Sequence, residues 1–269
     1  MRSGFLAAAG LAAAVVAQAP GYGVVDEMIG GDAPYSLVAD LDGDLDFDLL
    51  GGDVSLSALD DGTGRFVPGW PAAPSFPAPN PRLADLDGDG IKDLLYGAGS
   101  SVFWRRGVPG GFHAAATPLP VPTFLFSALR AGVGDIDADG DLDVLIVSPP
   151  TLVNQVRLFV NDGVGVFADA TAATAVAATA FNGGKLVDLD GDGLSDVLAW
   201  NRAPSAPVHV QRNLGGTFAP LQALPVSGLT SAGAIDGDFD ADGLVDVIVS
   251  GAPEDPIQFF RQTAPFVFG

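Results

Sequence analysis

Residues 188–196 read Asp-Leu-Asp-Gly-Asp-Gly-Leu-Ser-Asp, and the rest of the chain is organised around this pattern. Four further stretches alternate aspartates in the same way: residues 40–48 (DLDGDLDFD), 85–93 (DLDGDGIKD), 135–143 (DIDADGDLD) and 238–246 (DFDADGLVD). We call these five stretches the Asp loops and number their positions 1 to 9. Their first aspartates lie 45, 50, 53 and 50 residues apart. A period of this size is typical of a propeller blade or a solenoid turn.

The sequence around each loop indicates β-strands. A short apolar run precedes the loop and another follows it, as residues 185–187 and 197–199 do around the fourth loop. Such runs, rich in branched residues, are typical of buried strands. A third run then ends in a glycine-containing turn, and a phenylalanine follows that turn at Phe66, Phe112, Phe167 and Phe218. We expect these phenylalanines to open a fourth strand, which makes each unit a four-stranded blade.

The sequence therefore predicts an all-β protein, a β-propeller with five four-stranded blades. The last unit ends at Phe266-Val267-Phe268-Gly269, where its fourth strand would begin. The segment from Tyr22 to Asp40 has about the length that separates each of these phenylalanines from the next Asp loop, so we expect the N-terminus to supply the missing fourth strand and close the last blade. Closure would hide the sheet edges, which otherwise invite aggregation.

The spacing of the carboxylates predicts calcium sites. Calcium prefers six to eight hard oxygen ligands, and aspartates at positions 1, 3, 5 and 9 of a tight loop can point at one ion, joined by the carbonyl of position 7. Glycine at position 6 would allow the sharp turn. An EF-hand is excluded, because it needs an acidic residue at position 12 and flanking helices. The sequence predicts up to five Ca²⁺ ions, held by Asp40, Asp42, Asp44, Asp46 and Asp48; Asp85, Asp87, Asp89, Ile91 and Asp93; Asp135, Asp137, Asp139, Asp141 and Asp143; Asp188, Asp190, Asp192, Leu194 and Asp196; and Asp238, Asp240, Asp242, Leu244 and Asp246.

The net charge, the N-terminal segment and the absence of cysteine indicate where the protein is located and which partners it can bind. Acidic residues outnumber basic ones 33 to 12, and 22 of the acids lie in the Asp loops. A formal charge of −21 argues against a nucleic-acid partner. Residues 1–19 resemble a signal peptide, with cleavage expected near residues 17–19, which would leave residues 20–269 as the propeller with no membrane span. We expect a secreted, periplasmic or cell-surface protein that uses bound metal where other exported proteins use disulfides, since the chain has no cysteine.

The five loops, the apolar strand after each and a later Gly-x-Phe resemble the FG-GAP/VCBS repeat family over residues 36–269. That last element is Gly64-Arg65-Phe66, Gly110-Gly111-Phe112, Gly165-Val166-Phe167 and Gly216-Thr217-Phe218. The resemblance implies an integrin-α-like β-propeller with calcium in the loop between the first two strands of each blade. It implies no single activity, since members of the family adhere, bind sugars or proteins, or accompany catalytic domains.

The function expected from the sequence is a binding or adhesion module for an extracellular protein or glycan. Trp200 and Trp70 are the candidate ligand contacts, whereas Trp104, in an expected strand, fits packing better. Two alternatives remain open: a lyase-like enzyme that acts on polysaccharides, and a purely structural surface protein. We expect no catalysis and assign no catalytic residue, because the chain has no Gly-x-Ser-x-Gly, P-loop or HExxH motif and only two histidines, in different units.

Overall fold

The computed structural model describes residues 37–39, 48–50, 57–60, 66–68, 81–98, 101–108, 111–112, 115–121, 130–147, 156–177, 181–201, 206–229 and 233–269. Throughout these segments the regular elements are β-strands, which confirms the predicted all-β class. No helix in the described segments is long and apolar enough to cross a membrane. The expected signal peptide and N-terminal closing strand lie outside the described residues.

The strands form five consecutive units, which we call blades 1 to 5. Blade 1 contains β1 (Leu37–Ala39), β2 (Asp48–Leu50), β3 (Ser57–Asp60) and β4 (Phe66–Pro68). Blade 2 contains β5 (Arg82–Ala84), β6 (Asp93–Ala98), β7 (Ser101–Arg105), β8 (Gly107–Val108), β9 (Gly111–Phe112) and β10 (Thr117–Pro118). Blade 3 contains β11 (Ala131–Gly134), β12 (Asp143–Val147), β13 (Val156–Asn161) and β14 (Phe167–Asp169). Blade 4 contains β15 (Gly183–Val187), β16 (Asp196–Trp200), β17 (Val208–Gln211) and β18 (Gln222–Leu224), and blade 5 contains β19 (Gly233–Gly237), β20 (Asp246–Ser250), β21 (Gln258–Phe260), β22 (Gln262–Ala264) and β23 (Val267–Phe268).

Each blade is built on an antiparallel meander. In blades 1, 3 and 4 the four strands lie side by side in chain order. Blade 2 has the sheet order β5-β6-β7-β10, with β8 and β9 forming a separate hairpin. Blade 5 has a three-stranded sheet, β19-β20-β21, followed by the hairpin β22-β23. Among the described residues, the main sheet of blades 1 to 4 therefore has the predicted four strands, and the main sheet of blade 5 has three.

The predicted role of the phenylalanines is right in two blades and wrong in two. Phe66 and Phe167 begin β4 and β14. Phe112 lies instead in the β8-β9 hairpin, and Phe218 forms an isolated bridge with Asn213 ahead of β18. The physical reason is visible at Phe218: its ring is buried in the cluster between blades 3 and 4, so burial of the ring and not the start of a strand fixes its place.

Three hydrophobic clusters lie between successive blades. The cluster between blades 2 and 3 includes Leu95, Trp104, Ile146 and Phe159. The next, between blades 3 and 4, is built around Leu145, Leu158 and Val197, and the third joins Leu198 and Val210 to Val247. The inner strands of blades 3 and 4 thus have one face in each of two clusters, as neighbouring Leu145 and Ile146 demonstrate in β12. Side chains that alternate between the two faces of a strand account for this double use.

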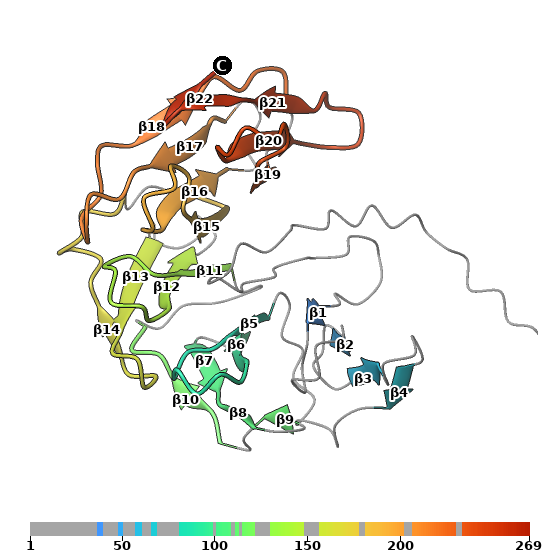
Figure 1. Ribbon diagram of the computed structural model, residues 1–269, viewed down its shortest axis with the longest axis vertical. Coiled ribbons are helices and arrows are strands. Elements are labelled where there is room, and N and C mark those ends of the chain that lie inside the picture. The colour runs from blue at the N-terminus through green and yellow to red at the C-terminus, as the bar shows by residue number, and fades with distance from the viewer. Residues whose placement is uncertain are drawn as a thin grey trace, which may run out of the picture.

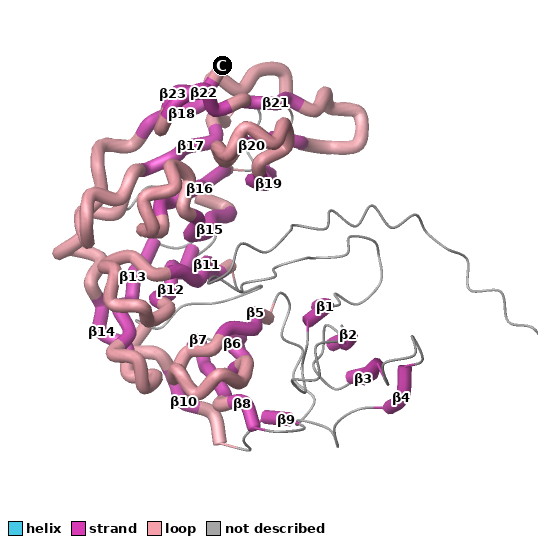
Figure 2. The backbone as a smooth tube through the Cα atoms, viewed as in Figure 1, coloured by secondary structure: helices cyan, strands magenta, loops and turns pink. Residues whose placement is uncertain are grey.

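The blades follow one another along an arc (Figure 1), from β1–β4 at the lower right to β19–β23 at the top. Figure 2 shows that loops connect short strands along the whole arc. Among the described strands, no sheet joins blade 5 to blade 1. The described blades are therefore propeller-like, and five-bladed closure stays a prediction.

Candidate metal centres

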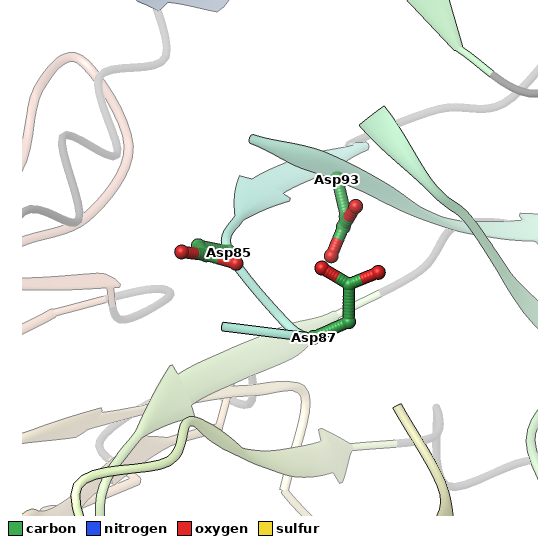
Figure 3. A group of neighbouring side chains, drawn as sticks. All are labelled: Asp85, Asp87 and Asp93. Atoms are coloured by element: carbon green, nitrogen blue, oxygen red, sulfur yellow. The ribbon is translucent and has the colours of Figure 1, made fainter. Parts of the chain in front are cut away.

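Four Asp loops lie in the described residues, each between the first and second strands of its blade. In each loop a backbone pair closes the base: Ala84 with Asp93, Gly134 with Asp143, Val187 with Asp196, and Gly237 with Asp246. This closure brings the carboxylates of positions 1, 3 and 9 together. One oxygen from each lies within 4.8 Å of the others in the four triads Asp85/Asp87/Asp93, Asp135/Asp137/Asp143, Asp188/Asp190/Asp196 and Asp238/Asp240/Asp246. Figure 3 shows the triad of the second Asp loop, Asp85/Asp87/Asp93, with the side chains of Asp87 and Asp93 pointing toward each other.

The aspartate at position 1 shapes the turn. In the third loop, Asp135 Oδ1 accepts hydrogen bonds from the N–H groups of Asp137 (3.2 Å) and Ala138 (2.7 Å). Its Oδ2 accepts one from Gly140 N–H at 3.0 Å. The N–H of position 6 donates to position 1 in the other three loops as well, at 2.8–2.9 Å. The loop backbone thus wraps around this carboxylate.

The aspartate at position 9 is fully buried in all four loops. Asp143 illustrates its role: Oδ2 accepts from Ile136 N–H at 2.9 Å, and Oδ1 accepts from Asn161 N–H, also at 2.9 Å. Burial raises the pKa of Asp93 to about 6 and the pKa values of Asp143 and Asp196 to about 7, although these hydrogen bonds oppose the shift.

The aspartate at position 5 lies outside the triads. Its Oδ1 accepts the N–H of position 7, for example at 2.9 Å from Ile91 N–H to Asp89 and at 3.0 Å from Leu194 N–H to Asp192. Positions 3 and 5 also face an arginine in three loops. Arg106 Nε lies 2.7 Å from Asp87 Oδ2, and its NH2 lies 2.9 Å from Asp89 Oδ2. Arg212 and Arg261 lie in the same way against the fourth and fifth loops.

Among the described residues, no arginine lies against the third loop in this way. Burial, followed by the charges of Asp139 and Asp135, raises the pKa of Asp137. Burial and the same two neighbours, together with Asp162, raise the pKa of Asp141. This loop therefore carries the most crowded negative charge of the four described loops.

A hydrogen-bonded relay connects the loops of neighbouring blades. Asn161, whose N–H binds Asp143, reaches back through its side-chain Nδ2 to the carbonyl of Leu86 in the second loop at 2.7 Å. Asn213 Nδ2 reaches Ile136 O in the third loop at 2.7 Å, and Gln262 Nε2 reaches Leu189 O in the fourth at 2.6 Å. All three amides are buried. The four position 9 aspartates thus belong to one continuous network from blade 2 to blade 5.

The loops also line a partly open cavity of about 380 Å³. Its walls come from the loops of blades 2, 3 and 4, including Asp85, Lys92, Asp135, Asp141 and Asp188. The strand residues Val133 and Leu186 form part of its apolar lining. A small, mostly polar ligand could contact three blades at once there.

The comparisons with known proteins fit this geometry. The model of the FG-GAP-like repeat matches residues 85–146, 135–199 and 188–249, which together span more than half of the chain. The chain belongs to the FG-GAP-like repeat family. Each match begins at position 1 of one Asp loop and ends in the second strand of the following blade. No curated protein matches the chain by sequence.

Solved structures resemble the fold of this chain at low sequence identity. An Agrocybe aegerita lectin that recognises non-reducing terminal N-acetylglucosamine is 21% identical, with a TM-score of 0.62, and the match covers 87% of this chain and 64% of the lectin. A chain of the Photorhabdus luminescens Tc holotoxin pore is also 21% identical, with a TM-score of 0.53, over 88% of this chain and 11% of that one. The chain thus spans less than two thirds of either protein, and the likeness concerns the fold alone.

The FG-GAP-like loops fit a hard cation such as calcium. Asp85 Oδ1, Asp87 Oδ1 and Asp190 Oδ1 are buried without a hydrogen-bond donor among the described residues. A buried carboxylate oxygen without a donor is costly, and calcium takes such oxygens as ligands. Positions 1, 3 and 9 are the side chains that would hold the ion in each loop. Ligation by position 5 and by the position 7 carbonyl stays a prediction, as does the first loop, of which residues 40–47 lie outside the described residues.

The candidate aromatic contacts are in different situations. Trp200, at the end of β16, is partly buried, and its ring lies against Gly183 of β15, where a Cβ would come within 2.4 Å of it. Trp104 is 7% exposed and lies in the cluster between blades 2 and 3. Trp70 and His113 lie outside the described residues. His209 packs against Phe181, with ring centroids 5.4 Å apart, and burial lowers its pKa.

Sequence reasoning missed the arginines and the relay amides. Both follow from one register: the first residue after the third strand is the arginine, and the second donates its N–H to position 9, as in Arg106-Gly107, Arg212-Asn213 and Arg261-Gln262. Alignment of the repeats beyond the loops would have revealed this pair of positions. It would also have shown that Val160-Asn161 departs from it.

Proposed function

We propose that this protein is a secreted, calcium-stabilised β-propeller that binds a glycan or protein partner and performs no catalysis. The observation that carries the proposal is the fold it shares with the N-acetylglucosamine-recognising lectin over 87% of this chain. The proposal assigns stability to the metal sites of the Asp loops, and recognition to the surface that these loops and their neighbours form.

The cavity among blades 2, 3 and 4 supports a small polar ligand. Its lining combines aspartates, Lys92 and several glycines with a few apolar residues. Sugar hydroxyls both donate and accept hydrogen bonds, so they can pair with such mixed groups. A terminal sugar residue is therefore the glycan unit that we propose for this cavity.

The proposed ring contains five blades, with the N-terminal strand completing blade 5. The outward face of blade 5 supports it. Ile235 is 55% exposed and Phe259 is 47% exposed, and both pair with Ile248 across the sheet. The residues that correspond to Ile248 in blades 2 to 4 are Leu95, Leu145 and Leu198, all fully buried by a neighbouring blade. Blade 1 is the neighbour that would cover Ile248 in a closed ring.

A glycan array tests the recognition proposal. We expect calcium-loaded protein to bind glycans with an exposed terminal sugar, with N-acetylglucosamine-terminated glycans as the first to examine. Lys92→Ala, in the cavity, should weaken binding, whereas Arg157→Ala, on the blade 3 surface beside Asp169, should leave it unchanged. Absence of binding to every glycan would contradict the glycan version and leave a protein partner, to be sought by cross-linking on intact cells.

Turnover assays address the enzymatic alternative. The proposal predicts no release of unsaturated products from acidic polysaccharides. Measurable lyase activity that survives purification, and that is lost when a residue outside the Asp loops is substituted, would contradict a purely binding role. Failure to find any soluble ligand would instead favour a structural surface protein.

A further inference from the structure

One residue position separates the four described loops into two kinds. This position directly precedes the residue that donates its backbone N–H to the position 9 aspartate. In blades 2, 4 and 5 it is Arg106, Arg212 or Arg261, and its guanidinium pairs with the carboxylates of positions 3 and 5. In blade 3 it is Val160, a partly buried side chain that packs against the cluster between blades 3 and 4.

The third loop also carries more negative charge than the others. Asp141 stands at position 7, where the second, fourth and fifth loops have Ile91, Leu194 and Leu244. It lies against the turn at Gly163, where a Cβ would meet its carboxylate at 2.3 Å. None of the five aspartates of this loop forms an ion pair with another described residue. Within the described part of the chain, this loop therefore has five acids and no paired base, whereas each of its neighbours has four acids and one arginine.

The charges predict different responses to a cation. An arginine beside two carboxylates relieves their mutual repulsion, and the same positive charge disfavours a divalent ion nearby. The exposed ends of the arginines weaken this effect through solvent screening but do not remove it, because the side chains of the paired aspartates are mostly buried, with exposures from 1% at Asp190 to 34% at Asp192.

We propose that the residue at this position sets how strongly each loop depends on its cation. Arg106, Arg212 and Arg261 serve as internal counter-charges that lower the calcium affinity of their loops and hold them together when calcium is scarce. The loop of residues 135–143, with Val160 in that place, binds calcium most tightly and depends on it most. This inference rests on the proposed calcium sites.

Reciprocal substitutions test the inference in the full chain. Val160→Arg introduces the missing charge, and Val160→Met is its uncharged control of similar length. Arg106→Gln removes a charge from the second loop, and Arg106→Lys keeps it. Calcium binding to chelator-stripped protein is measured by calorimetry, and melting is followed in chelator without calcium.

We expect Val160→Arg to bind calcium about tenfold more weakly than Val160→Met at the tightest site and to melt at a higher temperature in chelator. Arg106→Gln should gain calcium affinity by a similar factor over Arg106→Lys and melt at a lower temperature in chelator. If Val160→Arg does not fold, the Arg106 pair decides, because that side chain is 53% exposed.

Equal calcium binding and equal melting within each pair would overturn the inference. Weaker calcium binding by Arg106→Gln than by Arg106→Lys would overturn it too, since the arginine would then be positioning the carboxylates for the ion. If none of the proteins binds calcium, the proposal of calcium sites is wrong. In that case the chelator melts would still decide whether the arginines act as counter-charges.

Discussion

At the scale of single residues, the Asp loops depend on backbone conformation as much as on carboxylates. Glycine at position 6 was predicted for a sharp turn, and Gly90, Gly140, Gly193 and Gly243 all have positive φ, between 86° and 91°. Position 4 needs the same region, with Gly88 at 71° and Ala138 at 64°. The positive φ at position 4 was not predicted, because two loops have alanine there and the sequence therefore gives no consistent glycine signal.

Ala138→Gly should stabilise the protein for this reason. An alanine in the left-handed region costs about 1–2 kcal/mol, partly offset by the greater freedom of glycine in the unfolded chain. We expect a net gain of about 1 kcal/mol in the free energy of unfolding, measured by denaturant titration. Ala168→Gly, at an exposed position of β14, is the control and should lose about 0.5–1 kcal/mol. A loss at both positions would contradict the strain at Ala138.

The buried position 9 aspartates predict a pH dependence in chelator. Burial raises the pKa of Asp143 and Asp196 to about 7, against an ordinary value of 3.8. A carboxyl with a raised pKa binds its proton more tightly in the folded protein, so its stabilising effect is lost as pH rises through this range. The unfolding free energy in chelator should therefore fall between about pH 4 and pH 7, and less steeply in Asp143→Asn. An equally steep fall in Asp143→Asn would exclude that residue as a cause.

At the scale of elements, the sequence predicted the local features and missed the long-range ones. Alternating aspartates and apolar runs specify the loop and its two flanking strands, because these contacts are close in the chain. The fourth strand was misplaced in blades 2 and 4: Phe112 lies in a separate hairpin, and Phe218, which is buried between blades, resembles in sequence a phenylalanine that opens a strand. The relay was invisible because Asn161 and Leu86, which it joins, are 75 residues apart.

Asn213→Ala tests the relay between blades 3 and 4. The substitution leaves the carbonyls of Ile136 and Ser195 without the donor that Asn213 Nδ2 provides at 2.7 and 3.1 Å. Loss of buried hydrogen bonds of this kind costs about 1–3 kcal/mol, and we expect a destabilisation of about 2 kcal/mol by chemical denaturation. Gln222→Ala, which removes an exposed amide bonded to Phe266 O, should cost under about 1 kcal/mol. Similar losses for both variants would show that the relay contributes no special stability.

At the scale of the whole molecule, the exposed apolar face of blade 5 indicates how the arc of blades would close. Blade 5 presents Ile235, Phe239 and Phe259 on one face, and the rings of Phe239 and Phe259 meet edge to face at 6.3 Å. Exposed apolar patches of this kind mark interaction surfaces. The same face of blades 2 to 4 is covered by the next blade, which makes blade 1 the expected neighbour.

Phe259→Lys tests whether this face is covered. If blade 1 covers it, a buried lysine should destabilise the protein by about 2 kcal/mol or more. Val267→Lys, on the exposed strand β23 at 54% exposure, is the control and should change stability by under about 0.5 kcal/mol. Unchanged stability of Phe259→Lys would argue against closure. If the original chain forms a concentration-dependent dimer in sedimentation and Phe259→Lys does not, the face would be assigned to a second copy of the chain.

The central claim is that calcium bound in the Asp loops stabilises the propeller, and melting with and without chelator tests it most directly. At a tenfold excess of free calcium over its dissociation constant, each site adds about 1.4 kcal/mol, or roughly 3–6 °C in a chain of this size. We predict that chelation lowers the melting temperature by at least that amount, and that calcium restores it where an equal concentration of magnesium does not. Identical melting in calcium and in chelator would contradict the claim.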